Sequence, residues 1–275
     1  MELTFWGVRG TFPVSGKSVS KYGGHTLCAS VVSSRGTVII IDAGTGIKKL
    51  GEKLLGENRE DPLEVCLLLT HFHLDHIMGI PFFAPLYSSR SSLTIYAPGS
   101  PKTTEKYLSG LMAGRYFPLE FGETLCQKIF REIPDEEFDI GGIHVAHTPL
   151  NHPQGALSYA LREAGKSVVF ATDTEHPDRG IDEKLATFAT GADLFIYDAS
   201  FTPEEYKSGK KGWGHSTWLE GTKIASKARV KNLCLSHFNP DHQDSQIDGI
   251  ISAARNEFAN SEGAREGLKK IFELG

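Results

Sequence analysis

The sequence lacks any long hydrophobic run. No stretch of apolar residues approaches the roughly 18 needed to cross a bilayer, and residues 1–10 (MELTFWGVRG) lack the basic region and apolar stretch of a secretory signal. We therefore expect a soluble, unsecreted protein without a membrane partner. Hydrophobic residues make up 40% of the 275, which is enough for a large core and too many for a disordered chain.

Cysteine is scarce, and neither sign of charge is in large excess. The four cysteines are widely spaced and form no CxxC pair, so we expect reduced, buried packing residues and a cytoplasmic location. With 29 basic and 34 acidic residues, the net charge of −5 gives no general attraction for polyanions. A large nucleic acid is therefore disfavoured as a partner.

No Pro/Ser-rich linker and no low-complexity tract divides the chain, so we predict a single domain over residues 1–275. The less regular segment 98–123 indicates an inserted helix and loop. Helical spacing predicts helices over 218–228 and 247–258. Short apolar or alternating runs predict β-strands at 3–8, 27–33, 38–41, 63–69, 93–96, 143–147, 156–161, 167–171, 194–197 and 232–235.

The strongest functional signal is the motif HFHLDH at residues 71–76, which directly follows an apolar, strand-like run. A chance match to HxHxDH in a chain of this length has odds on the order of one in a thousand. In an extended or turning segment His71 and His73 point the same way, so both imidazoles can grip one cation. Asp75 and His76 then begin a helix-like turn that can face a second cation.

Further candidate ligands lie at other strand ends. His152, Asp173 and His237 each follow an apolar run directly or within a short turn, where open sheets place functional groups. Each of them alone is more often a hydrogen-bonded structural residue. Together with the HxHxDH motif they complete a set of imidazoles and carboxylates without thiolates, which suits zinc, manganese or iron. We favour zinc or manganese.

With these motifs the sequence closely resembles the metallo-β-lactamase superfamily, and within it the phosphodiesterase branch that includes ribonuclease Z and the cyclic-phosphate phosphodiesterases. The matching residues run from Asp42, in the segment IDAGTG at 41–46, to His237. The resemblance implies an α/β fold, a four-layer αββα sandwich with a dinuclear site at one edge. Asp42 would brace the loop that carries the ligands, and the alternative of a plain turn residue stays open.

The resemblance also implies which side chains hold two divalent metal ions per chain. The ligands of the first metal would be His71, His73 and His152. The ligands of the second would be Asp75, His76 and His237. Asp173 would bridge both ions. Each metal then has four protein ligands and room for a bridging water, whereas a structural zinc site would need only one metal with four closed ligands.

Two cations about 4 Å apart can activate a shared water and neutralise charge on a phosphoryl group. We therefore expect an enzyme that hydrolyses a small nucleotide or sugar phosphodiester, cyclic ones included, through a metal-bridging hydroxide, with Asp75 in the catalytic site. The leaving alkoxide needs a proton. His215, in GWGHST at 212–217, is the candidate donor, because this segment resembles the loop with the catalytic histidine in ribonuclease Z relatives. A solvated loop histidine is the alternative.

Other functions stay open. Ribonuclease Z-like RNA processing is disfavoured because no long basic arm lies between His152 and Asp173, although Lys207, Lys210 and Lys211 form a basic cluster near His215. A carbon-centred hydrolase, such as a lactamase or thioesterase, can use the same metals. A binding or regulatory module with a non-catalytic metal centre and a redox di-iron site are further alternatives.

Contacts to the substrate are less defined. Arg9 could meet a phosphate oxygen or form a surface ion pair. Tyr116 and Phe117 could form an aromatic wall against which a base stacks, or a lid on the core, or a dimer contact. His25 stands where relatives often have asparagine, and His242 is expected to be a turn residue and not an eighth ligand. A homodimer is expected from relatives that commonly form dimers.

Overall fold

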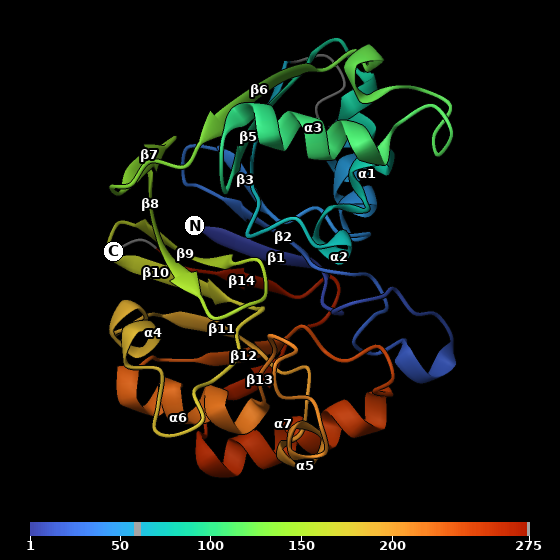
Figure 1. Cartoon of the computed structure of the whole chain (residues 1–275). Coiled ribbons are helices and arrows are strands. Elements are labelled where there is room, and N and C mark those ends of the chain that lie inside the picture. The colour runs from blue at the N-terminus through green and yellow to red at the C-terminus, as the bar shows by residue number, and fades with distance from the viewer. Residues whose placement is uncertain (58–61, 274–275) are drawn as a thin grey trace.

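The computed structural model describes residues 1–57 and 62–273 and contains two β-sheets of seven strands each (Figure 1). The strands of the first sheet, in spatial order, are β14 (Lys269–Ile271), β1 (Glu2–Gly7), β2 (Cys28–Val32), β3 (Val38–Ile41), β4 (Leu63–Leu68), β5 (Ser91–Ala97) and β6 (Gln127–Glu132). Those of the second sheet are β13 (Ser261–Gly263), β12 (Leu233–Ser236), β11 (Leu194–Asp198), β10 (Lys166–Ala171), β9 (Ala156–Glu163), β8 (Ile143–Leu150) and β7 (Phe138–Ile140).

Helices cover the outer side of each sheet (Figure 1). The first sheet carries α1 (Ile47–Glu57) and α3 (Pro101–Leu111), and the second carries α4 (Glu183–Phe188), α6 (Trp218–Ala228) and α7 (Asp244–Glu257). The order helix, sheet, sheet, helix confirms the predicted αββα sandwich. Short elements in the connections are α2 (Leu74–Ile77), α5 (Pro203–Lys207), η1 (Lys17–Val19), η2 (Ile80–Phe82), η3 (Ala84–Tyr87) and η4 (Phe121–Glu123).

Apolar side chains fill two cores, one on each face of the first sheet. Strand β3 shows the division, because alternate residues of a strand point to opposite faces. Ile39 and Ile41 belong to the core that also contains Tyr159 and Phe195 of the second sheet. Ile40 belongs to the core beneath α1 and α3. The first sheet is thus buried on both faces, which explains why β3 is a continuous apolar run.

Strand direction brings the ends of distant segments together. Strands β3 to β6 are parallel to one another, as are β10 to β13. Strand β8 runs in the same direction as β10, since each pairs antiparallel with β9. The carboxyl ends of parallel strands lie at one edge of a sheet, and residues that follow these strands therefore become neighbours.

The structure agrees with most of the predicted elements. The helices predicted over 218–228 and 247–258 correspond to α6 and α7, and the segment 98–123 contains α3 and η4. That this segment is an insertion, and that residues 1–275 form a single domain, stay predictions. None of the described helices is long and apolar enough to cross a membrane.

Candidate metal centre

The metal-ligand candidates lie where β4, β8, β10 and β12 end. Asp173 and His237, which follow β10 and β12, and Asp42, which follows β3, have φ angles of 61°, 58° and 57°. These angles lie in the left-handed region that non-glycine residues rarely adopt. Such backbone strain costs about 1–3 kcal/mol per residue and persists only where the surrounding structure enforces it. The strain is concentrated at the edge where the sequence predicts the site.

His71, His73 and His152 form one cluster of imidazoles. The His152 Nε2 atom lies 3.0 Å from His73 Nδ1, and the ring centroids of the three residues are 4.5–4.8 Å apart. His71 and His152 are buried, whereas His73 is partly exposed. Three ring nitrogens can therefore face one point, as the first predicted metal requires.

Asp75, His76 and His237 form the second cluster. Asp75 Oδ2 lies 3.4 Å from Nε2 of His76 and 3.4 Å from Nε2 of His237. All three side chains are buried, and the His76 and His237 rings stack with centroids 5.5 Å apart. This grouping matches the second predicted ligand set.

Asp173 lies between the two clusters. Its Oδ1 atom is 3.9 Å from Nε2 of both His71 and His152, and its Oδ2 atom is 3.2 Å from Nε2 of His76. Oδ1 is also 3.2 Å from Nε2 of His237. The carboxylate thus reaches both groups of imidazoles, as the predicted bridging role requires.

The buried atoms of this centre fit divalent cations. Four buried atoms of the centre have no hydrogen-bond partner among the described residues. They are the Nε2 atoms of His71, His76 and His237 and the Oδ2 atom of Asp173. Each buried polar atom without a partner costs about 1–3 kcal/mol. A cation satisfies several such atoms at once, and neutral imidazoles with carboxylates are ligands for zinc or manganese.

Each histidine of the two clusters is held by a hydrogen bond at its other ring nitrogen. Such bonds fix the ring orientation and the tautomer of a metal ligand. In the first cluster, His71 is bonded to Thr70 Oγ1 at 3.0 Å, His73 to Gln154 Oε1 at 2.9 Å and His152 to the Gly214 carbonyl at 2.7 Å. In the second cluster, His76 is bonded to Asp42 Oδ2 at 2.7 Å and His237 to Ser200 Oγ at 2.9 Å.

Asp42 also accepts hydrogen bonds from the backbone amide and the hydroxyl of Thr70, at 2.8 and 2.9 Å. Its buried carboxylate therefore ties the residue before His71 to the ring of His76. This geometry gives Asp42 the bracing role that the resemblance implies. Asp42 is more than a plain turn residue.

The electrostatics of the centre favour bound positive charge. Burial and the neighbouring His76 lower the pKa of His71 to about 2, so this imidazole is neutral and free to bind a cation. Burial opposes charge on His237, but Asp173, Asp75 and Asp198 outweigh it and raise the pKa to about 10. Burial likewise opposes charge on the Asp173 carboxyl, but His237 and His76 hold its pKa well below the usual value. Metal ions can replace the protons that these carboxylates attract.

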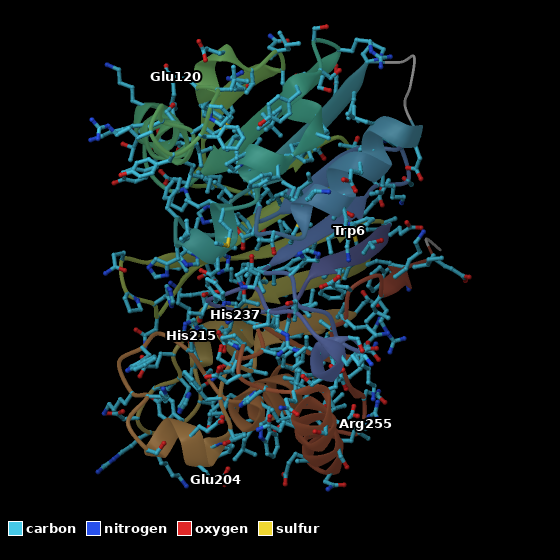
Figure 2. The ribbon with its side chains drawn as sticks, turned by 90° about the vertical axis from the view of Figure 1, so that its right-hand side faces the viewer. Trp6, Glu120, Glu204, His215, His237 and Arg255 are labelled. Carbon is cyan, nitrogen blue, oxygen red and sulfur yellow. The ribbon has the colours of Figure 1, made fainter. Side chains whose placement is uncertain are left out.

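His215 lies next to the two clusters. Its ring stacks on His237 with centroids 4.8 Å apart and lies 5.3 Å from the ring of His152 (Figure 2 shows His215 beside His237). Its Nδ1 atom donates to Asp198 Oδ2 over 3.0 Å, which leaves Nε2 on the opposite side of the ring. The structure thus places His215 beside the predicted metal ligands.

Sequence reasoning missed Asp198. This carboxylate is fully buried and accepts hydrogen bonds from the backbone amides of Asp173, Ser200 and Ser216. It therefore joins the turn after β10 to the loop that carries His215. The signal was present in the sequence, because Asp198 ends the apolar run 194–197 in the same way that Asp42 ends 38–41.

Glu175 was also missed, and it holds the His215 loop from another side. Its carboxylate accepts hydrogen bonds from the backbone amides of Gly212 and Gly214 and from the Tyr206 hydroxyl, at 2.7, 2.9 and 2.7 Å. Gly214 in turn accepts the bond from His152. A Cβ at Gly214 would approach the His152 ring to 2.4 Å, so only glycine fits here.

The expected substrate contact of Arg9 is not supported by its position. Arg9 is fully buried, and its guanidinium donates to the backbone carbonyls of Gly23, Asn239 and His242. It joins three loops and is neither a surface ion pair nor open to a ligand. The adjoining loop approaches the centre through its backbone, since the Thr11 amide donates to Asp75 Oδ2 over 2.7 Å.

A cavity of about 440 Å³ adjoins His71 and His73, and the expected aromatic wall differs from its actual lining. Tyr116 is 83% exposed and does not line the cavity, and Phe117 packs edge-to-face on Phe82. The aromatic residues that do line it are Phe72 and Tyr107. Phe72 lies between two predicted ligands, and Tyr107 lies on α3 within the same irregular segment as Tyr116.

The remaining residues singled out in the sequence have local roles. His242 is buried and its Nε2 atom lies 2.8 Å from Glu205, so it is a turn residue with its own partner. His25 contacts Thr45 through Nδ1 at 3.1 Å. In the basic cluster, Lys211 pairs with Asp178, and the Lys210 ammonium lies 4.0 Å from the ring centroid of Trp213.

Comparison with known families agrees with this geometry. Residues 37–238, a segment that contains all seven ligand candidates, match the family described as the beta-lactamase superfamily domain. The chain therefore belongs to the metallo-β-lactamase superfamily. It is a metal-dependent hydrolase.

Similar proteins include ribonuclease Z of Thermoplasma acidophilum, with 22% identity over 94% of this chain and 92% of that protein. Ribonuclease Z of Bacillus subtilis is 23% identical over 98% of both chains. Among solved structures, the metallo-β-lactamase fold protein YhfI from Bacillus subtilis has a TM-score of 0.74 at 21% identity, with 98% of both chains covered. A diphosphatase from the PhnP family has a TM-score of 0.68 at 20% identity, covering 99% and 98%.

Proposed function

We propose that this chain binds two divalent metal ions, zinc or manganese, and hydrolyses a small nucleotide or sugar phosphodiester. The observation that carries the proposal is the set of buried, unpartnered ring and carboxylate atoms that face one another around Asp173. When bound, the two cations supply an activated water and neutralise the charge that develops on the phosphoryl group. His71, His73 and His152 would hold one ion, and Asp75, His76 and His237 the other, with Asp173 reaching both.

The chain's own proton donor would be His215. A phosphodiester releases an alkoxide, which is a poor leaving group unless it receives a proton, and an imidazole is suited to donate one near neutral pH. The bond from His215 Nδ1 to Asp198 fixes the ring and leaves Nε2 to carry that proton. The stacking of His215 on His237 supports this role, because it places the donor beside a residue of the second metal set.

A second candidate function is RNA processing, which the names of the curated relatives favour. The residues between His152 and Asp173 argue against it, because they form the hairpin of β9 and β10, joined at Ala164 and Gly165, and no basic arm. Lys211 is neutralised by Asp178. A small substrate therefore fits this surface better than a long polyanion.

A substrate panel tests the proposal. The protein is reconstituted separately with zinc and with manganese. It is assayed on nucleoside 2′,3′- and 3′,5′-cyclic phosphates, a ribose cyclic phosphate, bis(p-nitrophenyl) phosphate, a tRNA with a 3′ extension, a thioester and a β-lactam. We expect one small diester to be turned over far faster than the others and the RNA to stay intact. Cleavage of the RNA alone would favour the second candidate. Hydrolysis of a thioester or lactam with no activity on any diester would contradict both.

A further inference from the structure

A cavity lies beside the metal centre, and the hydrolysis described above assigns no role to its walls beyond His71 and His73. It has a volume of about 440 Å³, which falls within the range of small-molecule sites. His71 and His73 belong both to the cavity wall and to the metal centre. One substrate could therefore place its phosphate at the metals and another of its groups in the cavity. The other walls of the cavity include Phe72, Pro98, Thr103 and Tyr107.

Apart from His71 and His73, which belong to the metal-ligand cluster, only uncharged residues line the cavity. None of its lining residues is an aspartate, glutamate, lysine or arginine. A charged group would lose its hydration there without gaining a counter-ion, at a cost of several kcal/mol. The cavity therefore fits a neutral part of a substrate and not a second phosphate.

Two aromatic rings form a corner in this cavity. The rings of Phe72 and Tyr107 meet edge-to-face, with centroids 5.0 Å apart and an interplanar angle of 74°. Tyr107 is 49% exposed, so much of its side chain is open to contact. A planar ring can stack on one of the two faces while its edge meets the other, which is the arrangement that aromatic groups prefer.

Gln154 adds a polar group at the border of the cavity and the metal centre. Its Oε1 atom is engaged by Nε2 of His73 at 2.9 Å, which orients its amide group. The amide nitrogen of Gln154 has no acceptor among the described residues and can donate to a ring nitrogen or carbonyl. With Thr103 also in the lining, the cavity offers a few polar contacts in a mainly apolar wall.

We infer that this cavity binds the nucleobase of a nucleotide substrate whose phosphate lies at the metal centre. A nucleobase is planar, neutral and rimmed by hydrogen-bond acceptors and donors, as the aromatic corner and Gln154 require. A sugar alone lacks the flat face that stacks, and an alkyl chain lacks the polar edge. The inference rests on the proposed function for the position of the phosphate, and it identifies nucleotides as the substrate class.

The test measures binding and not turnover. Adenosine 5′-monophosphate and ribose 5-phosphate share a phosphate and a ribose, and only the first carries a base. Their affinities are measured by titration calorimetry on the zinc-loaded protein. We expect the nucleotide to bind on the order of tenfold more tightly, because stacking of a base on an aromatic side chain has about this effect. Equal affinities of the two ligands would overturn the inference.

Variants locate the binding. Tyr107→Ala should abolish the preference for the nucleotide, whereas Tyr107→Phe, which keeps the ring, should retain it. Tyr116→Ala is the matched control, because this tyrosine belongs to the same segment but lies outside the cavity. Thr103→Phe fills the cavity from another residue and should also abolish the preference. A preference that survives both Tyr107→Ala and Thr103→Phe would place the base elsewhere.

These outcomes can be told apart from failure of the proposed function. If the protein hydrolyses small diesters but binds the two phosphates equally, the proposed function stands and the nucleobase site is wrong. If no diester is hydrolysed, the binding comparison still decides whether the cavity accepts a base.

Discussion

The buried carboxylate of Asp198 accepts a hydrogen bond from Nδ1 of His215 over 3.0 Å, although Asp198 ends β11 and His215 lies on a loop 17 residues later. The same carboxylate accepts the backbone amide of Asp173, the residue between the two metal-ligand clusters. One side chain thus positions both the proposed proton donor and the turn that carries the proposed bridging ligand.

The first prediction concerns His215. Replacing it with alanine should lower kcat by about 10²- to 10⁴-fold, because the leaving alkoxide loses its proton donor. The metal content should not change, since the two ligand clusters remain complete. Steady-state kinetics on the best diester, together with elemental analysis, check both parts. Unchanged turnover would remove His215 from the mechanism, and loss of metal would make it a ligand.

The second prediction concerns Asp75. Its Oδ2 atom lies 3.4 Å from the Nε2 atoms of both His76 and His237. Asp75→Ala should therefore lose about one metal ion per chain and most of its hydrolytic activity. Elemental analysis after dialysis measures the loss. Asp178→Ala removes an exposed carboxylate paired with Lys211 and serves as the control, with an unchanged metal content. Equal metal in both variants would argue against Asp75 as a ligand.

The third prediction concerns Glu175 as a positioning residue. Glu175→Ala removes the acceptor of the Gly212 and Gly214 amides. The loop that they belong to then loses its anchor, and this loop carries both His215 and the Gly214 carbonyl that is bonded to His152. We expect kcat to fall by about tenfold and zinc affinity to weaken by about the same factor, as for other partners of metal ligands. Tyr206→Phe removes only one of the three bonds and should stay close to the wild type. A loss of stability with unchanged kcat and zinc affinity would give Glu175 a purely structural role.

The fourth prediction is a pH dependence of stability. Burial opposes charge on Asp193, but the bonds from Lys231 and the Ser167 amide outweigh it and lower the pKa of this carboxyl. A lowered folded-state pKa contributes stability that is present above the unfolded value near 4 and is lost as the pH falls through the folded value. Asp193→Asn should therefore lower the free energy of unfolding by about 1 kcal/mol at pH 7. The effect is small because the Lys231 side chain is mostly exposed, and solvent weakens the ion pair.

Urea unfolding of the wild type and Asp193→Asn at pH 7 and pH 3 measures this difference. The gap between the two proteins should shrink at pH 3. A gap of equal size at both values would show that the charge of Asp193 does not contribute.

The αββα sandwich was predicted from the resemblance to a known superfamily, and the residues that meet at its edge were predicted from the HxHxDH motif and from the ends of the apolar runs. His71 and His73 are neighbours along the chain, and the remaining ligand candidates follow strands whose carboxyl ends share one edge. That rule depends only on strand direction, so it can be applied before any contact is known. Whether these side chains bind metal stays a prediction.

The supporting contacts could not be predicted in the same way. The place of Asp198 at the end of an apolar run marks it as a candidate. Its partners, like those of Glu175 and Gln154, lie on loops distant in sequence, so the local pattern does not indicate them. That Tyr107 lines the cavity and Tyr116 does not depends on how α3 and the loop after it pack, which the sequence does not indicate. The burial of Arg9 could not be predicted either, because a buried arginine that donates to backbone carbonyls cannot be distinguished in sequence from one that faces a ligand.

Metal stoichiometry shows directly whether the seven candidate ligands hold two ions. The purified chain is stripped of metal, reconstituted with zinc, freed of loose ions by gel filtration and analysed by plasma mass spectrometry against protein concentration. We expect about two zinc ions per chain, which mild chelation should remove in two separate steps. A single tightly held ion, or none, would contradict this expectation.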